Sequence, residues 1–266
     1  MTMDVPVIMG IINLTKDSFY ANSRVDAENL VNKVKNILDE GADIIDLGAC
    51  SSRPGAKGVP VNEEVKIITS AVELIKSEFP DSVLSVDTFR SEVAETALVK
   101  GADIINDISA GQIDPKIHRV VANYQCPYIL MHMKGTPENM QNNPKYDNVC
   151  TEVFSFLNNK IDELVKAGIN DIIIDPGFGF GKSIEDNFKL LRNFEHFTLL
   201  QRPLLAGLSR KSMIWKTLET TPENALNGTS FCHSVALMKG ANILRVHDVK
   251  EARELVLLHQ VLNETI

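Results

Sequence analysis

Polar side chains that could bind a small molecule recur where short apolar runs of the chain end. One set consists of acceptors, among them Asp87, Asn106 and Asp175. A carboxylate can accept two parallel N–H bonds, so these residues suit the N–H edge of a flat amino-substituted heterocycle. The other set is cationic and suits phosphate oxygens. Its members are Arg53, Lys211 and Arg245, with His247 as a partner.

Further polar residues end the remaining apolar runs, so that every run delivers at least one such group. Asn13 ends the first run and could give one oxygen to Mg²⁺, an ion that keeps most of its waters and binds substrate phosphates. Any one of these residues could instead cap a helix or anchor a loop. A complete ring of polar ends favours a ligand site. The other members of the ring are Asp46, Ser51, Ser52, Thr88, Asp107, His132, Ser209 and Arg210.

The elements that must position these groups repeat along the chain. Four segments open with glycine and run through β-branched apolar residues to a polar end: 41–48, 101–108, 168–177 and 240–248. Their glycines lie about 60 to 70 residues apart, roughly twice the length of one strand–helix unit. Each glycine is placed to end the preceding helix.

Four more apolar runs lie between the repeats, at 5–13, 83–88, 127–132 and 203–209. Apolar runs without alternation are typical of strands buried on both faces of a parallel sheet. The stretches between them show helical periodicity, as in 26–40 and 61–79. Eight strands alternating with helices predict an α/β fold, a (β/α)₈ TIM barrel formed as one domain over residues 1–266. A doubly wound open sheet is the alternative, but it does not explain the regular doubling.

In such a barrel the active site lies at the C-terminal ends of the strands. Two long loops, 14–25 and 50–62, follow adjacent strands at that end and have the length of lids. The string DPGFGFGKS at 175–183 looks like a phosphate-binding loop, but Pro176 stands where that motif needs glycine. Its glycines instead indicate a sharp turn and close backbone approach. His132 has no metal-ligand partners at suitable spacing, so we expect it to pack in the core or line a pocket.

Composition limits the classes of partner. Apolar residues make up 44% of the chain, and the formal net charge is −8 with no basic tract. We therefore expect a folded protein that binds neither nucleic acid nor membranes. The four cysteines show no CxxC pair, and no apolar stretch could span a bilayer. These features predict a soluble, cytoplasmic protein. The final segment, 251–262, is apolar enough to form a core helix or one that faces a partner.

Eight motifs, taken together, resemble one family over nearly the whole chain and in order. They are MGIINLTKDSF, SSRPGA, SVDTFRSEVAE, INDISAG, LMHMKGTPENMQ, DPGFGFGK, LSRKS and RVHD. These strings resemble the dihydropteroate synthases of folate biosynthesis. The resemblance implies a TIM-barrel homodimer that uses Mg²⁺. It also implies a reaction that joins 4-aminobenzoate to 6-hydroxymethyl-7,8-dihydropterin diphosphate, giving 7,8-dihydropteroate and diphosphate.

The resemblance also implies a role for each site residue. The pterin would be held by Asp87, Asn106, Asp175 and Lys211, with Ile108 and Met131 beside the ring. The diphosphate would meet Arg245, His247 and, through Mg²⁺, Asn13. The two loops would cover the site with Phe19, Ser52, Arg53 and Pro54, and the aminobenzoate would lie against Phe180, Lys211 and Ser212.

The first loop departs from the family pattern. Lys16 replaces the usual proline, and Tyr20-Ala21-Asn22-Ser23 replaces Ser-Asp-Gly-Gly, so the acidic loop residue is absent at Ala21. Two alternatives therefore stay open. One is another pterin-binding barrel of the methyltetrahydrofolate methyltransferase type, which would not need Lys211 or Arg245. The other is a pterin-binding protein without catalytic activity.

Overall fold

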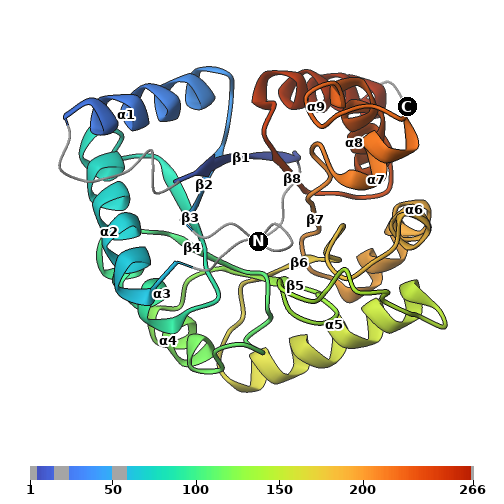
Figure 1. Ribbon diagram of the computed structural model, residues 1–266, viewed down its shortest axis with the longest axis horizontal. Helices are drawn as coiled ribbons and strands as arrows, with labels where there is room; N and C mark the ends of the chain where they lie inside the picture. Colours follow the sequence, from blue (N-terminus) through green and yellow to red (C-terminus); the bar gives the residue numbers. More distant parts are fainter. Residues whose placement is uncertain (1–4, 15–23, 50–58, 265–266) are drawn as a thin grey trace.

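Strands and helices alternate along the chain in the computed structural model, which describes residues 5–14, 24–49 and 59–264 (Figure 1). The strands are β1 (Val7–Asn13), β2 (Ile44–Gly48), β3 (Val83–Asp87), β4 (Ile104–Asp107), β5 (Tyr128–Met131), β6 (Ile172–Asp175), β7 (Leu205–Ala206) and β8 (Ile243–Val246). The helices are α1 (Arg24–Asp39), α2 (Val61–Glu78), α3 (Ser91–Val99), α4 (Lys116–Tyr124), α5 (Val149–Lys166), α6 (Ile184–Arg192), α7 (Ser212–Thr217), α8 (Leu226–Met238) and α9 (Val249–Glu264), with a 3₁₀ helix, η2, at Phe194–Leu200.

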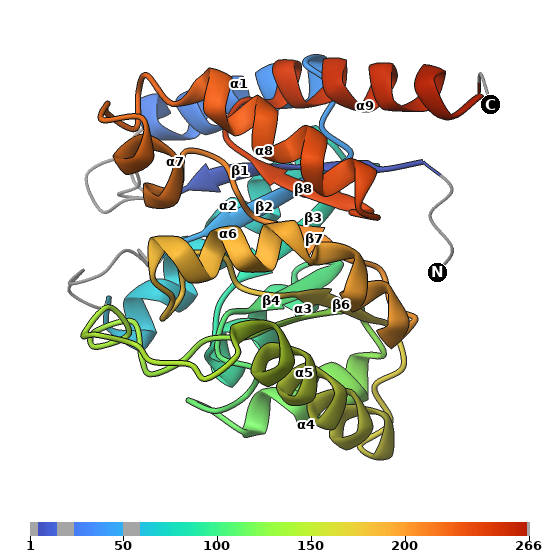
Figure 2. The ribbon, with the colours of Figure 1, turned by 90° about the vertical axis from the view of Figure 1, so that its right-hand side faces the viewer.

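The strands form one parallel sheet that curves into a barrel. Its order is β6-β5-β4-β3-β2-β1-β8-β7. The two terminal strands meet at a parallel bridge between Ile174 and Leu204, where the Ile174 N–H donates to the Pro203 carbonyl oxygen at 2.9 Å. The predicted (β/α)₈ barrel is therefore confirmed, and the open doubly wound sheet is wrong. The carboxyl ends of the strands all lie at one end of the barrel, the left side in Figure 2.

The barrel interior is filled by a layer of apolar side chains, one from nearly every strand. They form a cluster of their own: Met9, Ile44, Ile104, Ile129, Ile173, Leu205 and Ile243. Successive residues of a strand point to opposite faces, so the residue two positions further along each strand also points into the barrel. The apolar layer therefore lies directly below the strand ends and supports them.

Outside the barrel, the helices cover the strands with their apolar faces. In α2, Ile68, Val72 and Ile75 are almost fully buried, as the helical periodicity predicts. The glycines that open the four repeats have φ values between +88° and +106°, a region that L residues rarely adopt. The repeat thus marks the point where a helix ends and the next strand begins.

Some elements differ from the sequence-based expectation. The short helices α7 and η2 were not predicted, because neither is long enough to show a period. The final helix begins at Val249 and continues to Glu264, beyond the predicted 251–262. Among the described residues, none of the helices is both long and apolar enough to cross a membrane.

Candidate active site

The parallel register brings the predicted residues into rows at the carboxyl end of the barrel. Asn13 of β1 pairs with Gly48 of β2, Gly48 pairs with Asp87 of β3, and Asp87 pairs with Asn106 of β4. On the far side, Met131 of β5 pairs with Asp175 of β6. The structure thus brings polar groups from distant parts of the sequence to one rim.

Several of these residues lie two positions beyond the apolar layer and therefore point inward. Asp46 follows Ile44, Asn106 follows Ile104, and the same spacing holds for three more strands. The remaining inward residues of this kind are Met131, Asp175 and Arg245. A layer that is polar except for Met131 thus rests on the apolar one.

Arg245 joins two carboxylates at the centre of this layer. Its Nε donates to Asp46 Oδ2 at 2.7 Å, and its Nη2 donates to Asp87 Oδ2 at 2.8 Å. The Asn106 amide donates to the same Asp46 carboxylate at 3.3 Å. Asp46 is fully buried, and so its charge needs these partners. Arg245 is therefore held rigidly between strands β2 and β3.

The arginine also links the two chemical sets that the sequence suggested. Burial raises the pKa of Asp87 to about 7, although the Arg245 charge opposes the shift and the neighbouring Asp46 adds to it. Asp87, an acceptor predicted for the heterocycle, is therefore paired with Arg245, a cation predicted for the phosphate. The two sides of the rim are not separate.

Lys211 lies at the start of α7, after β7, the strand that pairs with β8. Its Nζ donates to the Phe178 carbonyl oxygen at 2.6 Å and lies 4.4 Å from the centre of the Phe180 ring. Burial lowers the pKa of this ammonium group to about 8, while the Asp175 carboxylate acts in the opposite direction. Asp175 is itself buried and accepts the Gly177 N–H at 2.7 Å. Burial raises the pKa of Asp175, against the influence of Gly177 and Lys211.

An apolar wall completes this side of the rim. Ile108 and Met131, the two residues predicted to lie beside a ring, belong to one buried cluster, and Phe180 packs against it. The other members are Met133 and Met140, with Phe89 also packed against them. A flat heterocycle held by Asp175 and Asn106 would have these side chains beside it.

His247 and Ser212 lie at the outer edge, and both are exposed. The His247 backbone N–H donates to Ser209 Oγ at 3.2 Å, and the same Oγ lies 3.0 Å from His247 Nδ1. A hydroxyl that accepts from the backbone can donate to Nδ1, which favours the tautomer with its proton on Nε2. Such an N–H could meet a phosphate oxygen.

Arg210, in contrast, is a structural residue. It forms two hydrogen bonds with Asp248, at 2.9 and 2.7 Å, and donates to the carbonyl oxygens of Pro222 and Glu223. This pair joins the SRKS and RVHD motifs. Of the two adjacent cations in SRKS, only Lys211 lies beside Asp175.

Five predicted residues, Phe19, Ser51, Ser52, Arg53 and Pro54, lie outside the described residues, as does the altered first loop around Ala21. Asn13 ends β1 with an exposed side chain. Within the described ranges there is no group of three or more His, Cys, Asp or Glu side chains that could hold a metal ion. One oxygen from Asn13 does fit an ion that arrives bound to phosphate, since Mg²⁺ keeps several waters.

Two functional candidates were not selected from the sequence. Asp46 was placed in the ring but given no role, and only the structure shows that it anchors Arg245 and Asn106. Lys182, in the glycine-rich string after β6, is 3% exposed and contacts groups that follow β5 and β6. The signal was present in that string, because Gly177 and Gly181 allow close approach: a β-carbon there would lie 2.0 Å from the His132 carbonyl oxygen and 2.2 Å from that of Lys134.

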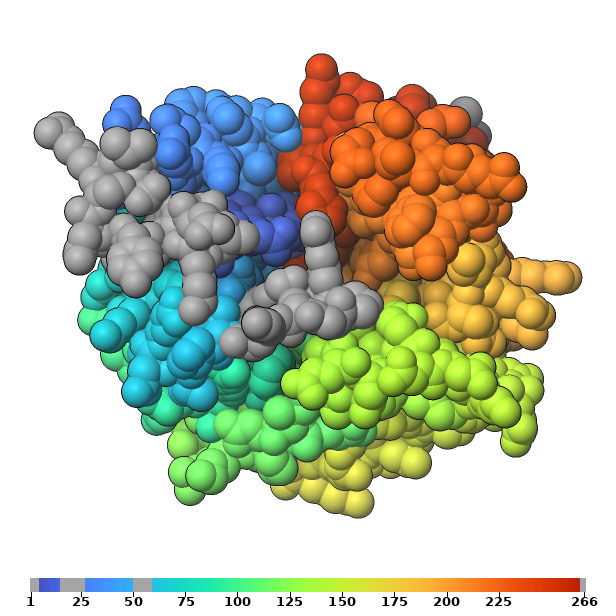
Figure 3. Space-filling model, in the orientation of Figure 1, coloured from blue at the N-terminus to red at the C-terminus, as the bar shows by residue number. Residues whose placement is uncertain are grey.

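Figure 3 shows this end of the molecule, where the segment after β5 (yellow-green) and the helices α7 and α8 (orange) stand around the barrel axis. The loop between β5 and α5 projects beyond the strand ends in Figure 2.

Comparison with known proteins agrees with this arrangement. The model of the pterin binding enzyme family matches residues 9–247. The chain therefore belongs to the pterin binding enzyme family, as the eight motifs suggested.

The relatives include several dihydropteroate synthases. The chain is 40% identical to that of Haemophilus influenzae over 261 residues, which cover 97% of this chain and 94% of the relative. It is 42% identical to that of Escherichia coli K12, covering 94% and 89% of the two chains.

Solved structures agree. The Yersinia pestis dihydropteroate synthase, solved with a sulfonamide drug complex, superposes with a TM-score of 0.92 at 37% identity, covering 100% of this chain and 97% of the other. The Xanthomonas albilineans enzyme, solved with 4-aminobenzoic acid, gives 0.90 at 39% identity, covering 99% and 95%.

Proposed function

We propose that this chain is a dihydropteroate synthase, a transferase that condenses 6-hydroxymethyl-7,8-dihydropterin diphosphate with 4-aminobenzoate. The observation that carries the proposal is the position of Lys211 and Arg245 on the same rim as Asp175 and Asn106. A pterin-binding barrel that transfers methyl groups has no need of these cations. Related Xanthomonas structures contain 4-aminobenzoic acid and 7,8-dihydropteroate, which supports the choice of substrates.

The residues act by binding and orientation. Asp175 and Asn106 would hold the polar edge of the pterin, with Ile108 and Met131 beside the ring. Asp87 would share this task while it holds Arg245 in place. An aryl amine is neutral at pH 7, so the reaction needs no strong general base.

The leaving diphosphate needs positive charge near it. Arg245 and the Nε2–H of His247 would face its oxygens, where fixed donors stabilise charge that develops during bond breaking. Phe19, Ser52, Arg53 and Pro54 would cover the site from the two loops. Lys211, Ser212 and Phe180 would border the aminobenzoate.

Magnesium would arrive with the diphosphate, held by one oxygen of Asn13 and by substrate phosphates. When bound, it would neutralise charge on the departing group. The free thiols of Cys126, Cys150 and Cys232 support the expected cytoplasmic location, because disulfides are rare in reducing compartments.

Two measurements test this function. Isothermal titration with the pterin diphosphate should show binding, and addition of 4-aminobenzoate should release diphosphate and form dihydropteroate. Binding without release would mean a catalytically silent pterin-binding protein. Methyl transfer from a methylated folate would mean the other type of pterin barrel.

The pH profile of this activity should depend on Lys211. The pKa of its ammonium group is lowered to about 8, so the cation is present below that pH and is lost as the pH rises through it. We expect kcat/KM to fall about tenfold per pH unit above pH 8, since this quantity reports on the free enzyme.

Lys211→Arg should move that fall beyond about pH 10, because a guanidinium keeps its proton. Lys216→Arg, on the exposed side of α7, is the matched control and should leave the profile unchanged. If kcat/KM of Lys211→Arg falls at the same pH as that of the unmodified enzyme, another group causes the loss of activity at high pH.

A homodimer is the second part of the proposal, with α8 and α9 as the shared surface. Large apolar side chains are exposed on both helices, with Met238 at 71% and Leu258 at 68%. The others are Phe231, Leu257, Val261 and Leu262. The two helices lie side by side (Figures 1 and 2), so these residues can form one apolar patch. A second copy would cover it.

Charge on that surface should separate the subunits. The double variant Phe231→Glu/Leu258→Glu is expected to sediment as a monomer, because association would bury unpaired carboxylates. Val99→Glu, on the exposed end of α3 across the barrel, should remain a dimer. Analytical ultracentrifugation decides between them. A monomeric unmodified protein, or an unchanged dimer of the double variant, would contradict the assignment.

A further inference from the structure

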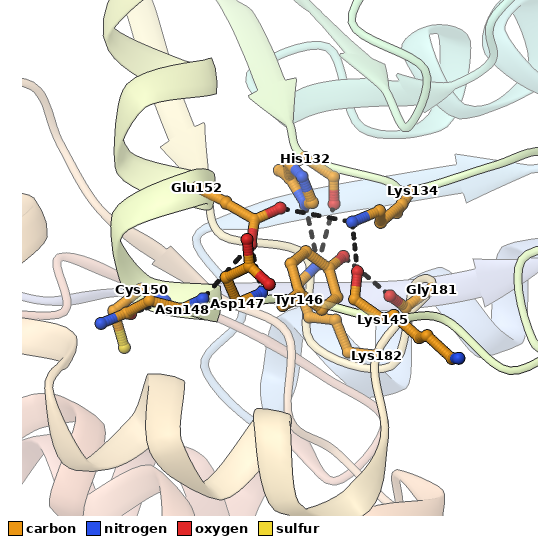
Figure 4. Close-up of polar contacts among 10 residues, drawn as sticks. All are labelled: His132, Lys134, Lys145, Tyr146, Asp147, Asn148, Cys150, Glu152, Gly181 and Lys182. Carbon is orange, nitrogen blue, oxygen red and sulfur yellow. Dashed lines mark hydrogen bonds and ion pairs between the residues drawn. The ribbon is translucent and has the colours of Figure 1, made fainter.

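The ammonium group of Lys182 is buried at the carboxyl end of β5 and β6, and four acceptors surround it. Its Nζ lies 2.8 Å from the Gly177 carbonyl oxygen, 3.1 Å from that of Phe180 and 3.2 Å from that of His132. The fourth acceptor is His132 Nδ1, at 2.9 Å. Figure 4 shows Lys182 reaching His132 behind the Tyr146 ring.

A buried cation of this kind is costly. Taking an ammonium group out of water costs several kcal/mol unless other groups satisfy it. No salt bridge to Lys182 is present among the described residues, so carbonyl oxygens and one imidazole provide its partners. Burial lowers the pKa of Lys182 to about 7, with Asp175 opposing and Lys211 adding to the shift. The neutral amine formed above that pH still has two N–H donors for these acceptors, so the hydrogen bonds do not depend on the charge. Burial also lowers the pKa of His132 to about 2, so the imidazole is neutral and can accept.

These acceptors come from two different segments. Gly177 and Phe180 belong to the turn between β6 and α6, which we call the β6 turn (residues 176–182), whereas His132 follows β5. Lys182 therefore closes the β6 turn on itself and ties it to the neighbouring strand. The close backbone approach at Gly177 and Gly181 brings these groups into range.

The loop after β5 adds two weaker ties to the same turn. The Tyr146 hydroxyl donates to the Gly181 carbonyl oxygen at 2.8 Å, and Gln141 Nε2 donates to that of Gly179 at 2.7 Å. A cavity of about 480 Å³ opens beside this loop, lined by Tyr146, Phe156 and His132 among others.

The β6 turn carries the groups that touch Lys211. Phe178 provides the carbonyl oxygen that accepts its Nζ at 2.6 Å, and the Phe180 ring lies under the same ammonium group. At Gly179, a β-carbon would lie 3.0 Å from Lys211 Cδ, so the backbone itself touches the lysine stem. A displacement of the turn would move all three contacts together.

We propose that Lys182 is a positioning residue: its buried ammonium group fixes the β6 turn so that the Phe178 carbonyl and the Phe180 ring hold Lys211 against the substrates. The inference rests on the proposed synthase function. It gives Lys182, the lysine of the glycine-rich string, a role that does not require contact with the substrates. Lys182 acts through Lys211 and not on the reacting atoms.

A double-mutant cycle tests the proposal. Lys182→Met removes the ammonium group and keeps most of the side-chain length. We expect kcat/KM for 4-aminobenzoate to fall at least about tenfold, chiefly through KM, in the otherwise unmodified enzyme. In a Lys211→Met background the same change should cost less than about threefold, because residues that act as a unit are not additive.

Lys189→Met on α6 is the matched control, since this exposed lysine pairs with Glu185 within its own helix. It should leave both constants unchanged. Circular dichroism and Tm establish that each variant is folded. If Lys182→Met does not fold, Lys182→Gln is measured instead. Because this variant keeps two donors for the carbonyls, its loss should be smaller, about threefold, and should again disappear in the Lys211→Met background.

Equal losses in both backgrounds would overturn the proposal, because they would show a role in stability alone. A folded variant with unchanged kcat/KM would overturn it as well. An inactive unmodified protein would overturn the synthase function, and this inference with it.

Discussion

Arg245→Ala will lower kcat/KM for the pterin diphosphate by about 100- to 1000-fold, the range found when a fixed donor to developing charge is removed. Arg245 is expected to face the leaving diphosphate, and its guanidinium is held by Asp46 at 2.7 Å and Asp87 at 2.8 Å. The loss should therefore appear mainly in turnover. Measurement of diphosphate release over a range of substrate concentrations gives kcat and KM separately.

The contact with Asp87 adds a second consequence. Without the arginine, two buried carboxylates face each other with no shared cation, which raises the pKa of Asp87 above its present value of about 7. Binding of a pterin without the diphosphate should then weaken as well, but only about tenfold. Equal losses in turnover and in that binding would mean that Arg245 serves the ring and not the leaving group.

Two further variants test whether the effects of Arg245→Ala arise from the loss of this arginine at the active site. Arg253→Ala removes an arginine that pairs with Asp43 and the Gly41 carbonyl oxygen at the opposite end of the barrel, and it should keep normal kcat/KM in folded protein. Arg245→Ala/Asp46→Asn relieves the repulsion between the carboxylates. It should recover the pterin affinity but not the turnover.

The strand–helix order and the ring of polar ends could be predicted because each depends on local sequence. Apolar runs, repeat glycines and helical periodicity depend on residues close together in the chain, and the barrel follows from their order. The contact between Arg245 and Asp46 could not be predicted in this way. It joins residues 199 positions apart, and it forms only because β8 closes on β1 beside β2.

Charge type alone does not separate neighbouring cations. Arg210 and Lys211 are adjacent in sequence, yet Arg210 pairs with Asp248 while Lys211 lies beside Asp175. Lysine is rarely buried, so the residue type alone did not indicate the position of Lys182, although the glycines beside it allow a close backbone approach. The side-chain directions of two adjacent residues depend on their backbone angles, and Arg210 has an unusual φ of +52°.

Asp175→Asn will raise the Kd of the pterin at least about 100-fold, equivalent to about 2.7 kcal/mol. The Gly177 N–H donates to Asp175 Oδ1 at 2.7 Å, which fixes which oxygen faces the backbone. In the variant, the amide oxygen would keep that bond, and the NH₂ group would take the place of Oδ2. A donor would then stand where the pterin also presents donors, and a buried unpaired donor is costly.

The pH dependence supplies an independent readout of the same change. Asp175 raises the pKa values of Lys211 and Lys182, so its neutralisation should lower both. The expected loss of kcat/KM above pH 8 should then begin at a lower pH in any residual activity. Asp171→Asn, at the exposed start of β6, is the matched control and should change neither the affinity nor the profile. Titration calorimetry that finds unchanged pterin affinity in Asp175→Asn would refute the assignment of this carboxylate to the heterocycle.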